Sequence, residues 1–202
     1  MPYRPDKREY RSIASSFQAV EHSADSESYI IEGYATTFDV PYDFGRGGMK
    51  ECISSRALDA ADMTDVVLQL NHEGAPLARL KNGSLAINRD SHGLHVRADL
   101  SGSKTGRELY EAVSNGLIDS MSWGFTVADG GWSYDRQNRT ATVERIDKVY
   151  DVSVVTFPAN ADTEVHARSY LDGVIEEEKQ ELLQRDMEKR MRSALRLRLI
   201  EL

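Results

Sequence analysis

A regular two-residue alternation runs through Ser120-Met121-Ser122-Trp123-Gly124-Phe125-Thr126-Val127. Successive side chains of a β-strand point to opposite faces of its sheet. One face would carry the large side chains of Met121, Trp123, Phe125 and Val127, and the other the small ones of Ser120, Ser122, Gly124 and Thr126. The first face predicts burial in a core. The second leaves room for a substrate, and Gly124 permits close backbone approach.

Strand patterns on both sides of this segment indicate a chain that is mainly β. Runs rich in β-branched, aromatic or alternating apolar residues cover 29–38, 66–72, 94–100 and 149–157. Asn82-Gly83 lies between two further short runs and predicts a hairpin, because both residues tolerate positive φ. Helices are expected over 54–62 and from Thr105, where Thr105 and Glu108 match a capping box.

The length of 202 residues fits one domain plus an appendage. We expect a flexible N-terminal arm over 1–28, within which one early strand stays open, a domain over 29–170 and an amphipathic C-terminal helix over 173–202. An apolar stripe repeats at every fourth position of that helix, at Leu183, Met187, Met191, Leu195 and Leu199. A four-residue step is not a heptad, so packing on the chain's own domain is favoured over a handle for a partner helix.

The bulk composition excludes several classes of protein. A net charge of −8 argues against a nucleic-acid-binding body, which would need clustered Lys and Arg. The single cysteine, Cys52, excludes an internal disulfide and fits a reducing cytoplasm; we expect it to be a small buried side chain rather than a nucleophile. The sequence has no apolar run of membrane-spanning length and no secretory signal, so we expect an intracellular protein without membrane contact.

A histidine outside the alternating strand could act together with Ser122. His72 ends the apolar run 66–72, and alternation puts it on the face of Leu68 and Leu70, where a loop follows. A histidine at a strand end beside a loop can serve a neighbouring hydroxyl as a general base. Taken alone, a hydrogen-bonded surface histidine is the ordinary interpretation.

A carboxylate stands inside another apolar strand. Asp151 and Ser153 would share one face of that strand, opposite to Tyr150 and Val152. Burying a carboxylate costs free energy unless it is solvated or hydrogen-bonded. The strand leaves two interpretations open: Asp151 orients a histidine, or it pairs with Lys148 or an arginine.

Other clusters of ligating side chains lack the spacing of a binding site. His92 and His95 would point to opposite faces of a strand, which disfavours a shared metal. Asp39, Asp43 and Glu51 lack the fixed spacing of a calcium loop. No glycine cluster is followed by the Lys-Ser/Thr of a phosphate-binding loop. We therefore expect no cofactor and no metal.

Several short motifs, taken in order, resemble the prohead proteases of tailed bacteriophages, a family related in fold to the herpesvirus assemblins. They are Glu32-Gly33-Tyr34-Ala35, Asn71-His72-Glu73, the D-x-x-G-L element from Asp90 to Leu94, Met121-Ser122-Trp123-Gly124-Phe125, and Asp151-Val152-Ser153-Val154-Val155-Thr156 followed by Pro158-Ala159. Each motif is short, but their order and spacing over residues 29–168 make the combination specific.

The resemblance implies both a fold and an activity. The fold would be mixed β/α and mainly β: a compact closed or nearly closed β-barrel flanked by helices, with a C-terminal helical tail. The activity would be that of a serine endopeptidase, with Ser122 on the family's serine position and His72 on its histidine position. Asp151 falls where many relatives carry glutamate and would be the third catalytic member. Three alternatives stay open: Asp147 or His166 as the third member, and Ser120 as the nucleophile.

The resemblance also implies partners and a place of action. The substrates would be the major capsid protein and scaffold segments, cleaved during procapsid maturation. Cleavage would occur inside the assembling procapsid in the host cytoplasm, or in the bacterial cytoplasm for a prophage-encoded protein. Self-association stays open. The alternative function is a catalytically inactive scaffold or assembly module that binds capsid subunits.

Overall fold

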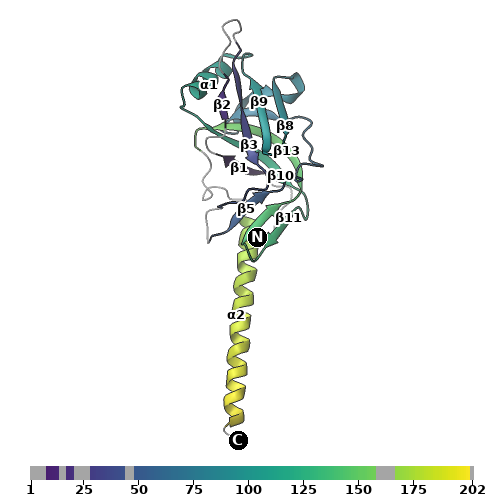
Figure 1. Ribbon diagram of the computed structural model, residues 1–202, viewed down its shortest axis with the longest axis vertical. Coiled ribbons are helices and arrows are strands. Elements are labelled where there is room, and N and C mark those ends of the chain that lie inside the picture. Colours follow the sequence, from purple (N-terminus) through teal and green to yellow (C-terminus); the bar gives the residue numbers. More distant parts are fainter. Residues whose placement is uncertain (1–7, 14–16, 21–27, 44–47, 158–166, 201–202) are drawn as a thin grey trace. The chain divides into compact units, whose positions relative to one another are not determined.

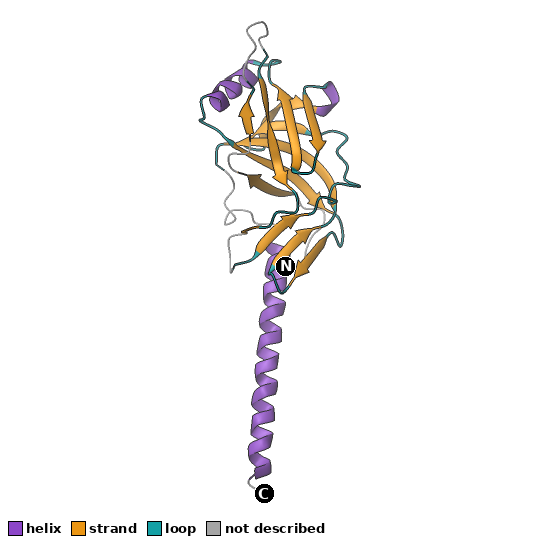
Figure 2. Cartoon of the chain, viewed as in Figure 1, coloured by secondary structure: helices purple, strands orange, loops and turns teal. Residues whose placement is uncertain are grey.

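The computed structural model describes residues 8–13, 17–20, 28–43, 48–157 and 167–200 (Figure 1). It divides into two compact units, one of residues 5–164 and one of residues 1–4 with 165–202. In the described part of the first unit strands predominate, with one α-helix, α1 (Lys104–Ser114), and a short 3-10 helix, η1 (Leu80–Asn82) (Figure 2).

The strands of the first unit form three sheets. A five-stranded sheet has the order β1 (Glu9–Ile13), β10 (Ser120–Val127), β13 (Ile146–Val155), β6 (Val67–Leu70) and β7 (Glu73–Arg79). A four-stranded sheet has the order β2 (Phe17–Ala19), β3 (Ile30–Thr37), β9 (Gly93–Asp99) and β8 (Leu85–Arg89). The third sheet has the order β11 (Trp132–Asp135), β12 (Thr140–Val143), β5 (Lys50–Ile53) and β4 (Tyr42–Asp43).

The expected closed or nearly closed β-barrel is wrong. Within the described residues none of the three sheets closes on itself, because a barrel needs its two edge strands to pair and here they do not. The edges of the five-stranded sheet are β1 and β7, and most residues of β7 are exposed. The expectation of several flanking helices is also wrong, since α1 is the one α-helix described in this unit.

Local hydrogen bonding explains why the helix expected over 54–62 does not form. This segment consists of turns. The Ser54 hydroxyl accepts a hydrogen bond from the Arg56 amide, and the Asp39 carboxylate accepts one from the Ser55 amide. Such side-chain bonds offer the backbone an alternative to helical pairing.

Two other expectations are shifted or wrong. Helix α1 is capped by Ser103, whose hydroxyl accepts from the Gly106 amide, and so begins before the expected Thr105. The hairpin expected at Asn82-Gly83 is wrong, because the strands on either side of it, β7 and β8, belong to different sheets. Gly83 does adopt positive φ, but it ends the 3-10 helix η1.

The apolar face of β10 forms the centre of the core, as predicted. Its four large side chains are at most 1% exposed: Met121, Trp123, Phe125 and Val127. Strand β3 packs against β10 and β1, which brings the second sheet onto this face of the first. Cys52 on β5 is buried, as expected.

The segment expected to be a flexible arm contributes two strands to the described structure. β1 lies antiparallel on β10, with Glu9 opposite Phe125 and Ile13 opposite Met121, and β2 pairs with β3. Part of residues 1–28 is therefore ordered in sheets. The limits expected for the domain over 29–170 stay a prediction.

The second unit contains the long helix α2 (Ala167–Ile200). It covers most of the helix expected over 173–202 and begins earlier. The side chains of Leu183, Met187 and Met191 from the predicted stripe are exposed. None of the described helices is long and apolar enough to cross a membrane.

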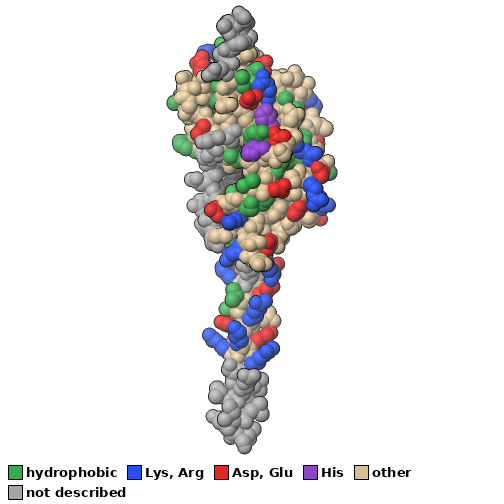
Figure 3. Space-filling model, viewed as in Figure 1, with side chains coloured by type: hydrophobic (Ala, Val, Ile, Leu, Met, Phe, Trp, Pro, Cys, Tyr) green, Lys and Arg blue, Asp and Glu red, His purple; other side chains and the backbone are tan. Residues whose placement is uncertain are grey.

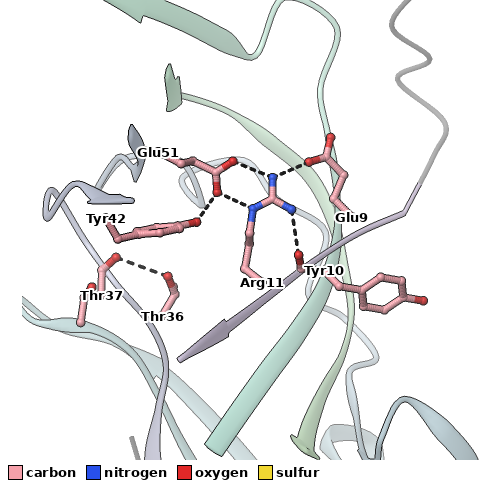
Figure 4. Close-up of polar contacts among 7 residues, drawn as sticks. All are labelled: Glu9, Tyr10, Arg11, Thr36, Thr37, Tyr42 and Glu51. Atoms are coloured by element: carbon pink, nitrogen blue, oxygen red, sulfur yellow. Dashed lines mark hydrogen bonds and ion pairs between the residues drawn. The ribbon is translucent and has the colours of Figure 1, made fainter. Parts of the chain in front are cut away.

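A buried ionic network joins the five-stranded sheet to the third sheet (Figure 4). Arg11 on β1 donates from Nη2 to Glu51 Oε2 and to Glu9 Oε2, each at 2.7 Å, and from Nη1 to the Tyr10 carbonyl at 2.8 Å. Its Nε donates to the other oxygen of Glu51, which also accepts from the Tyr42 hydroxyl. Arg11, Glu9 and Glu51 are at most 4% exposed, and burial raises the pKa of the Glu9 carboxyl.

Because both buried carboxylates of this network pair with the single cation of Arg11, removing that cation should be far more costly than removing a surface cation. We expect Arg11→Ala to lower the free energy of unfolding by about 3–5 kcal/mol, since two carboxylates would stay buried without a partner. The matched control is Arg97→Ala, which removes a half-exposed pair with Glu32 and should cost less than about 1 kcal/mol. Urea unfolding followed by tryptophan fluorescence measures both; equal losses would contradict the anchoring role of Arg11.

Candidate active site

The pairing of β10 with β13 assembles two of the predicted residues. Ser122 lies opposite Ser153 and Gly124 opposite Asp151 in this antiparallel ladder. Paired residues share a face, so Ser122 and Asp151 lie on the side of the sheet opposite to Trp123. Strand alternation therefore predicted correctly that both polar side chains avoid the aromatic core.

His72 reaches the same face through a tight turn between β6 and β7. Asn71 and His72 both have positive φ, 53° and 60°, and Leu70 pairs with Glu73 across the turn. Two central residues with positive φ are typical of the two-residue hairpin turns that match strand twist. The Asn71 side chain fixes the turn to the end of β13: its Oδ1 accepts from the Thr156 amide at 3.0 Å, and its Nδ2 donates to the Thr156 hydroxyl at 3.3 Å.

The expectation that His72 shares a face with Leu68 and Leu70 is wrong, and the turn is the reason. Leu68 lies opposite Val152, which lies opposite Trp123, so an uninterrupted strand would have carried His72 to the core side. The two residues with positive φ reverse the chain before that can happen.

The structure brings the three predicted site residues together in one hydrogen-bonded chain. His72 Nε2 lies 2.7 Å from Ser122 Oγ, and His72 Nδ1 is hydrogen-bonded to Asp151 Oδ1. A carboxylate can only accept hydrogen bonds, so Nδ1 carries the ring proton and donates a hydrogen bond to Asp151. Nε2 is then left to accept a hydrogen bond from the Ser122 hydroxyl. Ser153 Oγ also donates to Asp151 Oδ1, at 2.9 Å.

The site is more enclosed than the sequence predicted. Ser122 and Asp151 are each 1% exposed and the His72 side chain 18%. The Tyr10 ring lies edge-on to the His72 ring, with centroids 4.3 Å apart. The small polar face of β10 was expected to leave room for a substrate, but every residue of β10 is buried.

The alternatives for the nucleophile and the third member lie elsewhere or outside the described residues. Ser120 Oγ donates to Asp119 Oδ1 at 2.8 Å, whereas the hydroxyl facing His72 is that of Ser122. Asp147 is exposed on β13, four residues before Asp151. His166 lies outside the described residues.

Asp151 was expected either to orient a histidine or to pair with Lys148 or an arginine, and it contacts both a histidine and an arginine. It contacts His72, and its Oδ2 lies 3.6 Å from Arg8 Nη1. Lys148, the other suggested partner, donates instead to Asp62 Oδ2 at 2.7 Å. This ion pair is one reason why the pKa of Asp62 lies well below its ordinary value.

Three residues at the site were not predicted to belong to it. Ser153 could have been found, because alternation already placed it on the face of Asp151. Arg8 and Tyr10 come from the expected flexible arm, where the sequence pattern gave no sign that a strand would pair with β10.

The family model of the caudovirus prohead serine proteases matches residues 15–177. The chain belongs to this family. It is also 29% identical, over 160 residues, to the prohead protease of Enterobacteria phage HK97, covering 77% of this chain and 67% of that protein. The structure of the bacteriophage T4 capsid assembly protease has a TM-score of 0.47 at 13% identity, covering 76% of this chain and all of that one. The predicted family and the predicted serine protease activity are thereby confirmed.

Gly124 gives this prohead protease the space in which its buried acid lies. An ideal Cβ at position 124 would be 2.5 Å from Asp151 Oδ2 and 2.9 Å from Tyr10 Cε1. Real Cβ atoms do not come this close to other heavy atoms, so any side chain here must displace the carboxylate or the ring. Gly124 thus permits the close approach of side chains, and the close approach of a substrate backbone stays a prediction.

We expect Gly124→Ala to lower kcat about 100-fold, because the displaced carboxylate no longer orients His72 and misplacement by about 1 Å has an effect of that order. Gly102→Ala is the matched control, since no atom lies within 4 Å of its ideal Cβ, and it should keep nearly full activity. The measurement is turnover of a fluorogenic peptide that spans a capsid-protein cleavage site. Full activity in Gly124→Ala would show that this packing does not matter for catalysis.

Proposed function

We propose that this prohead protease hydrolyses peptide bonds of the major capsid protein and of scaffold segments, with Ser122 as nucleophile, His72 as general base and Asp151 as the acid that orients His72. The contact of 2.7 Å between His72 Nε2 and Ser122 Oγ carries the proposal. The bond from His72 Nδ1 to the buried Asp151 supports the same assignment from the other side of the imidazole.

The hydrogen-bonded chain fits the first half of acyl transfer. The Ser122 oxygen attacks the scissile carbonyl carbon while its proton passes to His72 Nε2. The imidazolium that forms is stabilised by the Asp151 carboxylate, which keeps Nδ1 protonated throughout. The imidazolium then gives its Nε2 proton to the leaving amine, and the peptide remains as an acyl ester on Ser122.

The second half returns the enzyme to its starting state. A water molecule takes the place of the departed amine and loses a proton to His72 Nε2 as it attacks the ester. Collapse of the second tetrahedral intermediate breaks the ester bond, and the proton on Nε2 returns to Ser122 Oγ. Each atom of the His72 ring needed for these transfers already has its partner in the structure.

Family membership and the likeness to the HK97 prohead protease support capsid and scaffold polypeptides as the proposed substrates, and the procapsid interior as the proposed place of action. The surface is in keeping with a polypeptide substrate. On the face drawn in Figure 3, Lys and Arg side chains are interspersed with Asp and Glu. The net charge of −8 would repel a phosphate backbone.

Replacing the nucleophile should abolish cleavage without unfolding the chain. We expect Ser122→Ala to lower kcat by about 10⁴-fold or more, because both halves of the reaction need its oxygen. The matched control is Ser120→Ala, on the same face of the same strand, which should lose less than about tenfold because its hydroxyl contacts Asp119 and plays no part in the transfer. Gel analysis of capsid protein co-expressed with each variant measures cleavage. Processing by Ser122→Ala would refute the assignment.

Labelling with a serine-directed fluorophosphonate distinguishes the proposed protease activity from the alternative function, an inactive assembly module. Labelling of wild-type protein that disappears in Ser122→Ala supports the proposal. Wild-type material that enters procapsids and is never labelled would favour the module.

The identity of the acid can be tested with two isosteric substitutions on β13. Asp151→Asn keeps the shape but lets the side chain donate to His72, which favours the wrong tautomer; we expect kcat to fall by about 10⁴-fold. Asp147→Asn changes an exposed carboxylate on the same strand and should leave kcat within about twofold of wild type. Steady-state cleavage of the same fluorogenic peptide compares the two. A larger loss in Asp147→Asn than in Asp151→Asn would reverse the assignment.

A further inference from the structure

The two oxygens of the Asp151 carboxylate have unequal surroundings. Oδ1 accepts from His72 Nδ1 and from Ser153 Oγ. Oδ2 is buried and has no hydrogen-bond partner among the described residues. The charge nearest to it is the Arg8 guanidinium, whose Nη1 lies 3.6 Å away.

Arg8 is held in this place by contacts on two further sides. Its guanidinium lies over the Tyr150 ring, 4.0 Å from the ring centroid, which is a favourable cation–π distance. Its Cδ lies 3.3 Å from the ideal Cβ position of Gly124, so the absence of a side chain there lets the arginine stem lie against β10. The Arg8 side chain is 41% exposed and thus keeps part of its head group in water.

The two faces of β1 explain how this arginine is presented to the site. Glu9 and Arg11 point to the core side, where the buried ionic network fixes the strand to Glu51 (Figure 4). Alternation puts Arg8 and Tyr10 on the other side, and Figure 4 shows the Tyr10 ring pointing away from that network. One face of the strand anchors it, and the opposite face contacts the catalytic residues.

We propose that Arg8 is a positioning residue for the catalytic acid: its guanidinium attracts Asp151 Oδ2 and thereby directs Oδ1 toward His72. The inference rests on the proposed function, because it assigns Asp151 the role of orienting the imidazole. Asp151 is 1% exposed, and burying a carboxylate costs free energy unless hydrogen-bond donors or a nearby positive charge compensate. The donors all lie at Oδ1, and Arg8 supplies the charge at Oδ2.

The proposal predicts a specific kinetic signature for Arg8→Gln. We expect kcat to fall about tenfold with KM changed less than about twofold, because Arg8 would act on the acid and not on the substrate. The acid limb of the kcat/KM profile should also move up by about half a pH unit, because loss of a cation near Asp151 makes protonation of the imidazole more favourable. Among the described residues, the titratable or charged groups in contact with His72 or with Asp151 are Asp151 itself, Tyr10 and Arg8. The exposed Glu73 follows His72 in the chain.

Four further variants separate charge from packing. Arg8→Lys keeps the cation and should recover kcat to within about threefold of wild type. Tyr150→Leu removes the ring under Arg8 and should lower kcat in part, whereas Tyr150→Phe keeps the ring and should not. Arg97→Gln, which removes a cation far from the site in the β3–β9 sheet, is the control for net charge. Equal thermal midpoints show that the variants are folded.

Wild-type kcat and an unmoved acid limb in Arg8→Gln would overturn the proposal. So would an Arg8→Lys enzyme as slow as Arg8→Gln, because the loss would then come from the shape of the guanidinium and not from its charge. The proposed function fails by a different result, namely cleavage by Ser122→Ala, so the two can be told apart in one set of assays.

Discussion

The antiparallel pairing of β10 with β13 determines which side chains face the core and which face the site. Its register sets Ser122 opposite Ser153 and Gly124 opposite Asp151, and it sets Trp123 opposite Val152 on the other face. A slip of one residue would exchange the two faces along the whole strand. Asp151 would then lie against the aromatic core without a donor. The buried apolar face of β10 therefore fixes where the serine and the acid can be.

The β10–β13 ladder does not determine where the imidazole lies. The β6–β7 turn brings His72 to the site, at a cost in backbone strain. Left-handed conformations cost an ordinary residue roughly 1–2 kcal/mol, and the turn has two in succession. Asn71 tolerates this conformation, and its side-chain bonds to Thr156 offset part of the cost. Strain of this kind persists where surrounding contacts hold it, and here those contacts are Ser122 and Asp151.

The sequence predicted which residues meet but not how they meet. Residue types and two-residue periodicity were sufficient for Ser122 and Asp151, because both lie within long strands where alternation holds. They failed at His72, because alternation says nothing about a chain reversal made by two residues with positive φ. They also failed at Arg8 and Tyr10, whose place depends on long-range pairing of a short polar strand with β10. The expectation of a barrel rested on the family resemblance, and no property of the predicted strands required a sheet to close.

The three residues proposed to be catalytic lie on elements of different local stability. Ser122 and Asp151 are on central strands of the five-stranded sheet, paired on both sides. His72 is on the hairpin with β7, an edge strand with mostly exposed residues, and elements of this kind open at a lower free energy than central strands. A displacement of that hairpin would separate Nε2 from the Ser122 hydroxyl while leaving the β10–β13 register intact. The buried serine and acid are thus held by the core, and the half-buried base is the member whose position can change without unfolding it.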